Sequence, residues 1–96
     1  MTVEFHPEAD DEFIAQIGFY ELQRSGLGDA FVNVVYQTLE RLLAFPELGK
    51  PAGQRTRRLL VQRFPHSVIY QYKNDRLFVL AVAHDKRQSG YWWDRT

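Results

Sequence analysis

His84 is the residue whose type and position best suit acid–base chemistry. It follows the apolar run at residues 77–83, so we expect it where a strand leaves a sheet. Side chains at such ends can converge on a groove. Because imidazole titrates near neutrality, His84 could serve as a base or as an acid. The alternative is a polar cap of the strand, hydrogen-bonded to the backbone.

A second candidate group is a set of arginines in the middle of the chain: Arg55, Arg57, Arg58 and Arg63. Guanidinium groups bind phosphates through paired hydrogen bonds. A strand over residues 58–63 would place Arg58 and Arg63 on opposite faces, because side chains alternate along a strand. The pattern favours two interpretations equally, a phosphate-binding surface or a solvated edge strand protected by its charges.

Charge is divided unevenly along a chain whose net charge is zero. Residues 1–47 hold nine carboxylates and two arginines, whereas residues 48–96 hold ten basic residues and three aspartates. Chance sorting between elements could produce this division. We favour a basic face that meets an anionic partner, either nucleic acid or an acidic protein segment.

No pattern in the sequence indicates a metal or another cofactor. The chain has no cysteine, and His6, His66 and His84 lack ligand-like spacing. It also contains no glycine-rich phosphate loop. No run approaches the roughly 18 apolar residues of a membrane span, and no signal pattern opens the chain. We therefore expect no cofactor, no membrane association and a cytoplasmic location.

The periodicity of apolar residues predicts the elements that position these groups. Residues 2–5 are β-prone, and Pro7 suits the first turn of a helix. Asp29 is the expected cap of a second helix, which Pro46 ends. The two helical stripes comprise Ala9, Phe13, Ile14, Ile17 and Tyr20, then Phe31, Val34, Val35, Thr38, Leu39, Leu42 and Phe45.

After a loop that contains Gly49, Pro51 and Gly53, the apolar period changes to that of strands, at residues 58–63, 66–72 and 77–83. The order β-α-α-β-β-β predicts a single α+β domain over residues 1–96. A helical hairpin should pack on one face of a small, mainly antiparallel sheet. We expect the first strand to pair beside the last and make it interior.

Local sequence along nearly the whole chain resembles the RelE/ParE toxin superfamily of type II toxin–antitoxin systems. The resemblance rests on His6-Pro7-Glu8-Ala9, Phe45-Pro46 with Gly49, Phe64-Pro65-His66 with Ile69-Tyr70, Ala81-Val82-Ala83-His84, and Arg87 with Tyr91-Trp92 and Arg95. It implies a cognate antitoxin, bound in a hetero-oligomeric complex. RelE-like members cleave messenger RNA on the ribosome, whereas ParE-like members bind DNA gyrase and block its cycle.

The resemblance to RelE-like ribonucleases implies catalytic roles for Arg87 and Tyr91. Arg87 would clamp a phosphate, and Tyr91 would stack on a base or move a proton. Arg63, or Arg58, and His84 would complete such a site. However, Ser67 stands where those enzymes usually carry an arginine before Val68-Ile69-Tyr70, the chain is neutral, and its predicted helices are long.

These departures favour a ParE-like, non-catalytic inhibitor of gyrase. The alternatives are a RelE-like ribosome-dependent mRNA endoribonuclease and a degenerate member that only binds its antitoxin. For antitoxin or target binding we select six residues: Arg55, Arg57, Arg58, Trp92, Trp93 and Arg95. At least one of the two tryptophans should instead cover an open end of the core, because such rings bury large areas.

Overall fold

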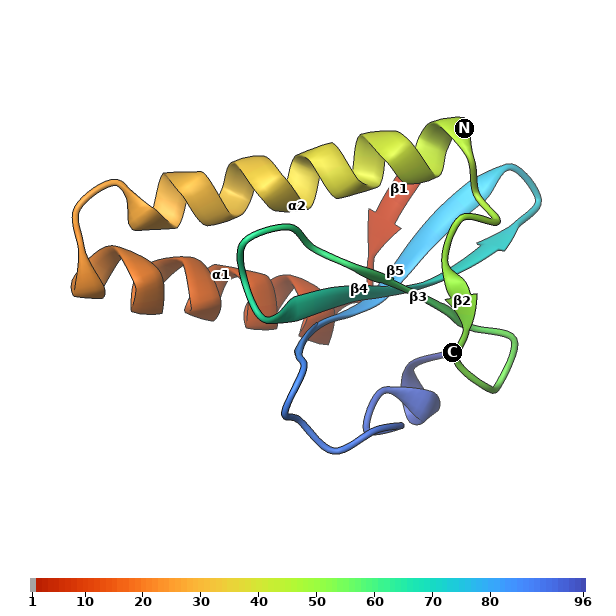
Figure 1. The fold of residues 1–96 in the computed structure, drawn as a ribbon. Helices are drawn as coiled ribbons and strands as arrows, with labels where there is room; N and C mark the ends of the chain where they lie inside the picture. The colour runs from red at the N-terminus through yellow and green to blue at the C-terminus, as the bar shows by residue number, and fades with distance from the viewer. Residues whose placement is uncertain (1) are drawn as a thin grey trace.

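The computed structural model describes residues 2–96. Its elements follow the order β-α-α-β-β-β-β and end in a short 3-10 helix (Figure 1). They are β1 (Thr2–Phe5), α1 (Pro7–Gln23), α2 (Leu27–Ala44), β2 (Lys50–Pro51), β3 (Arg57–Leu60), β4 (His66–Lys73), β5 (Arg76–His84) and η1 (Trp93–Arg95).

One five-stranded sheet forms the centre of the molecule, in the order β1-β5-β4-β3-β2. β1 lies parallel to β5, and every other pair is antiparallel. The predicted α+β fold and the interior position of the last strand are therefore confirmed. The loop prediction was wrong at β2, where Lys50 and Pro51 pair with Arg58 and Arg57. A two-residue edge strand has too few positions to show alternation in sequence.

Both helices begin and end close to the predicted residues, but α2 is capped differently. α2 begins after Gly26, whose φ of 88° is readily adopted only by glycine. Asp29, the expected cap, lies inside the first turn. The Glu21 carboxylate of α1 instead accepts hydrogen bonds from the backbone N–H groups of Gly26 and Gly28. This contact caps α2 from the neighbouring helix and closes the hairpin.

The two faces of the sheet are covered by different parts of the chain. The helical hairpin covers one face, where Val68, Tyr70 and Leu77 are fully buried. The other face buries Ile69 and Leu80 against Trp92 of the carboxy-terminal segment. Figure 1 shows the helices above the sheet and this segment below it. The alternation predicted for residues 66–72 is confirmed, because each face takes alternate side chains of β4.

Three details of the predicted packing were wrong. Ile14 and Phe45, placed in the helical stripes, are 59% and 67% exposed. The strand predicted over residues 58–63 spans Arg57–Leu60 instead. Arg63 lies beyond it with a φ of 70°, so strand alternation does not govern its side chain.

Tyr70 of β4 connects the sheet to the loop that follows α2 through two hydrogen bonds. Its buried hydroxyl donates to the Pro46 carbonyl at 2.7 Å and accepts from the Gly49 N–H at 3.0 Å. Tyr70→Phe leaves both backbone groups unpaired, so we expect the free energy of unfolding to fall by about 2 kcal/mol. Urea denaturation measures this change. The matched control, Tyr72→Phe, alters a ring that is 44% exposed and should change stability by less than about 0.5 kcal/mol.

Candidate functional site

The carboxyl end of β5 gathers polar groups from three strands. His84 pairs with His66 in the β4–β5 register, and the two rings lie 5.1 Å apart. The His84 Nδ1 atom accepts a hydrogen bond from the Lys86 backbone N–H at 3.1 Å. This is the backbone cap that one interpretation of the sequence expected.

Asp85, which sequence reasoning missed, is the centre of a polar triad at the edge of the sheet, whose arginine and aspartate side chains are 36% and 30% exposed. Its Oδ1 atom accepts from the Ser67 hydroxyl at 2.8 Å and from the Arg58 guanidinium at 3.0 Å. Arg58 Nε also donates to Ser67 Oγ. Ser67 is fully buried, so it serves this triad and offers no surface group. An acidic residue directly after the last strand was the available signal.

His66 was also missed, because a histidine that begins a strand gives no sign of its burial. It is 2% exposed, and its Nε2 atom lies 2.8 Å from the Tyr20 hydroxyl on α1. Within residues 2–96 its Nδ1 atom has no hydrogen-bond partner. Burial, together with the repulsion from His84 and against the attraction of Asp85, lowers the pKa of His66 to about 4. The ring is therefore neutral at physiological pH.

Arg95 attaches the carboxy-terminal segment to α1. Its guanidinium donates to both carboxylate oxygens of Glu12, at 2.9 and 3.1 Å, and to the Leu80 carbonyl at 2.9 Å. Glu8 contributes a further ion pair at 3.2 Å. Arg95 is the most buried of the ion-paired arginines, with 9% of its side chain exposed. Its cation is consequently compensated inside the molecule.

The aromatic residues next to Arg95 divide between core and surface. The Arg87 guanidinium lies 4.0 Å from the centroid of the Tyr91 ring. Burial raises the pKa of Tyr91 to about 12, assisted by the Glu12 carboxylate and opposed by Arg87 and Arg95. Such a phenol holds its proton tightly at neutral pH. Trp92 is buried, which confirms that one tryptophan covers the core, whereas Trp93 is 46% exposed.

Three of the four residues selected for catalysis, His84, Arg87 and Tyr91, are linked by contacts in the carboxy-terminal segment. Arg87 and Tyr91 stack together, and His84 caps the end of β5. Arg63 lies with its guanidinium 5.9 Å from the Phe64 ring centroid. A site for phosphodiester cleavage needs a base, an acid and cations around one phosphate. Arg87 donates its backbone N–H to the His84 carbonyl at 2.9 Å, whereas no hydrogen bond, ion pair or ring contact given within residues 2–96 links Arg63 to the other three.

An exposed apolar surface, which we name the Leu48 surface, lies between the end of α2 and β3. It comprises Phe45, Leu48, Leu60 and Tyr72, with Lys50 and Arg58 beside them. Three grooves of about 910, 680 and 690 Å³ meet at Leu48. Arg57 shapes this region by donating to the Glu47 and Gly49 carbonyls. Arg55 is exposed in the preceding turn.

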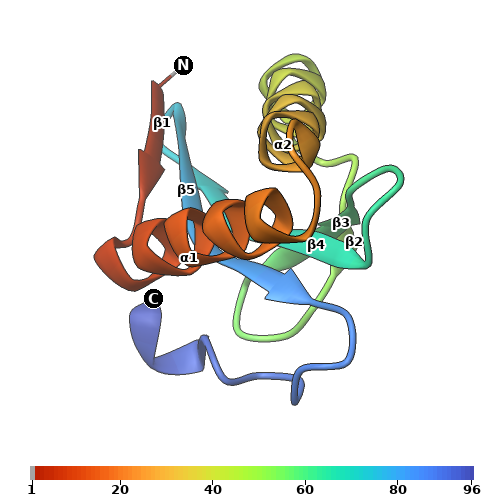
Figure 2. The same ribbon diagram turned by 90° about the vertical axis from the view of Figure 1, so that its left-hand side faces the viewer.

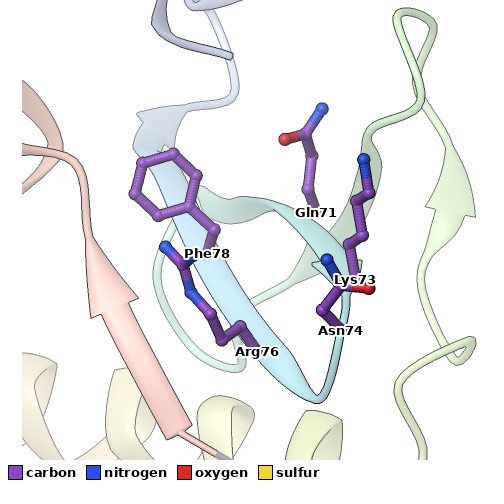
Figure 3. A pocket seen from close by; sticks show the side chains of 5 residues that line it. All are labelled: Gln71, Lys73, Asn74, Arg76 and Phe78. Carbon is purple, nitrogen blue, oxygen red and sulfur yellow. The ribbon is translucent and has the colours of Figure 1, made fainter.

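A small hollow of about 400 Å³ lies at the β4–β5 turn (Figure 3). Phe78 forms one wall, and Arg76 lies along its ring, with the guanidinium carbon 6.0 Å from the ring centroid. Arg76 also forms an ion pair with Glu4 of β1, so one of the two cations in the hollow is compensated. Gln71, Lys73 and Asn74 complete the lining. The hollow therefore lacks the concentrated positive charge of an anion site.

Residues 2–96 contain no group of three potential metal ligands. Over the same residues, neither helix combines the length and apolar character needed to cross a membrane.

Comparison with known proteins relates the chain to one family. Residues 3–89 match the family model described as the ParE toxin of the type II toxin–antitoxin system parDE. No curated protein matches the chain. Among solved structures, the chain is similar to one described as the chromosomal ParDE TA system from P. aeruginosa, with a TM-score of 0.66. The likeness covers 88% of this chain and 95% of that chain at 17% identity, and it is a likeness of fold.

The buried imidazole of His66 predicts a loss of stability in acid. In the unfolded chain His66 binds a proton below about pH 6.5, whereas in the folded chain, where its pKa is lowered, it does so only below about pH 4. The free energy of unfolding should therefore fall across this window, by about 3 kcal/mol from this residue. Urea denaturation at several pH values measures the slope. His66→Gln should flatten it, whereas the control His6→Gln should retain it; equal slopes in both variants would contradict the assignment.

Proposed function

Because this chain belongs to the ParE toxin family of type II toxin–antitoxin systems, we propose that it inhibits DNA gyrase and catalyses no reaction of its own. A cognate antitoxin is the partner that such a system provides for its toxin. Binding of the antitoxin would hold the inhibitor inactive until the antitoxin is lost.

The ion pairs of two arginines support the proposal that the protein catalyses no reaction. Arg95 is paired with Glu12 and Glu8, and Arg58 is paired with Asp85. Ser67 occupies a buried position in which it accepts from Arg58 and donates to Asp85. These groups stabilise the fold. A ribonuclease would need cations that are free to neutralise a phosphate in the transition state.

The Leu48 surface supports inhibition by binding. Exposed apolar patches on small proteins mark interaction sites. This one combines four large apolar side chains with the cation of Lys50 at its border. We propose that an acidic, apolar segment of the antitoxin lies across it and overlaps the contact with gyrase. Arg55, exposed nearby, would add a salt-sensitive contact at the rim, whereas Trp93 is the exposed candidate of the carboxy-terminal segment.

One experiment separates inhibition from RNA cleavage. The protein is induced without its antitoxin, and gyrase supercoiling and gyrase-dependent DNA cleavage are measured together with the 5′ ends of translated messages. We expect arrested gyrase and intact RNA. Codon-phased RNA cuts that disappear in Arg87→Ala or Tyr91→Phe would overturn the proposal in favour of the ribonuclease.

The Leu48 surface gives a prediction for a matched pair of leucines. Leu60→Glu places a charge among apolar side chains and should weaken antitoxin binding by about tenfold or more, because buried interface residues of this kind contribute over about 1 kcal/mol. Isothermal titration calorimetry measures the affinity. Leu22→Glu is the control, since Leu22 is 91% exposed and lies at the far end of α1. Equal affinities for the two variants would rule out the Leu48 surface as the antitoxin site.

A further inference from the structure

The free edge of β1 is a place where the backbone itself is open to a partner. β1 ends the sheet order, and Figure 2 shows it at the outer side of β5 with no strand beyond it. The N–H groups of Thr2 and His6 donate to the carbonyls of Asp75 and Val79. Backbone groups of successive strand residues point to opposite edges. The N–H and C=O groups of Val3 and Phe5 therefore point away from the sheet.

An apolar groove runs along this open edge. It has a volume of about 710 Å³ and lies between β1 and the second half of α2. Val3 and Phe5 form one wall, and the Phe5 ring stacks on Phe13 of α1 at 5.9 Å. The opposite wall comes from α2 and consists of Tyr36, Leu39, Glu40 and Leu43. Glu40 is the only charged residue among the six that line the groove, and it is exposed.

The open edge and the groove belong to the same two residues. Val3 and Phe5 turn their backbone groups outward and their side chains toward the groove. An added strand would form hydrogen bonds with these outward backbone groups. Its alternate side chains would then lie in the groove, which is how a protein recognises a peptide by strand addition. Apolar side chains of the added strand would lie against Val3 and Leu43, and a basic residue would meet Glu40 at the rim.

We propose that β1 accepts an extended segment of the antitoxin as an additional strand, with apolar residues at alternate positions and a basic residue opposite Glu40. The inference rests on the proposed function, since it assigns a second contact to the same partner. Glu40 also lines one of the grooves that meet at Leu48, so the two contacts are continuous around α2. A second copy of this chain fits less well, because its own Val3 and Phe5 already pack against its core.

Val3→Pro tests the main-chain contact. Proline removes the outward N–H of Val3 and leaves the β1–β5 hydrogen bonds in place, which an edge strand tolerates. Val3→Thr is the matched control, because it keeps the branched shape and the N–H. The probe is the antitoxin encoded with the toxin, titrated against each purified variant, with thermal melts to confirm folding. Loss of one main-chain hydrogen bond should weaken binding about five- to tenfold in Val3→Pro alone.

Amide exchange of the wild-type complex gives a readout that needs no variant. Antitoxin binding should slow exchange at Val3 and Phe5 by at least about tenfold, whereas the His6 amide, which already bonds to Val79, should change little. A tight complex with unchanged exchange at Val3 and Phe5 would overturn this inference and leave the proposed function standing. Protection of these amides in the free toxin, rising with its concentration, would assign the edge to a second copy instead. Absence of any complex would refute both.

Discussion

The ion pair between Arg95 and Glu12 is the contact on which the closed form of this domain depends. A central sheet has two apolar faces, and one helical hairpin covers only one of them. The last residues must therefore return across the open face, and Trp92 supplies the apolar cover there. Arg95 holds that return in place by binding two carboxylates of α1 and the Leu80 carbonyl. Breaking a buried pair of this kind costs about 3–5 kcal/mol.

Three arginines of the basic half are likewise held by groups of their own chain. Arg57, Arg58 and Arg95 all donate to carbonyl or carboxylate groups of their own chain. Two apolar surfaces remain accessible: the Leu48 surface on one side of α2 and the groove beside β1 on the other. A fold that holds these three arginines by internal contacts and leaves apolar grooves and a strand edge open is suited to binding proteins. That character agrees with membership of a family of toxins paired with antitoxins.

Sequence patterns predicted the parts of the fold that depend on local periodicity. Alternation at Val68, Ile69 and Tyr70 identified β4 and both of its faces, and the uniform apolar run of β5 identified an interior strand. The errors arise where a distant residue decides the outcome. Glu21 caps α2 in place of Asp29, and burial of His66 depends on Tyr20, 46 residues away. Asp85 joins Arg58 and Ser67 only after three strands align. No local pattern encodes these contacts, and so the polar triad was missed while the family resemblance was found.

The return of the carboxy-terminal segment also sets the order in which the fold can close. Arg95 contacts Glu12, 83 positions earlier in the sequence. Contacts between residues so far apart form late in folding, because the chain between them must first be closed into a loop. The contacts of the helical hairpin are more local and can form earlier. The face of the sheet that Trp92 covers therefore stays open until Arg95 reaches α1, and the folding chain is most prone to aggregate in that interval.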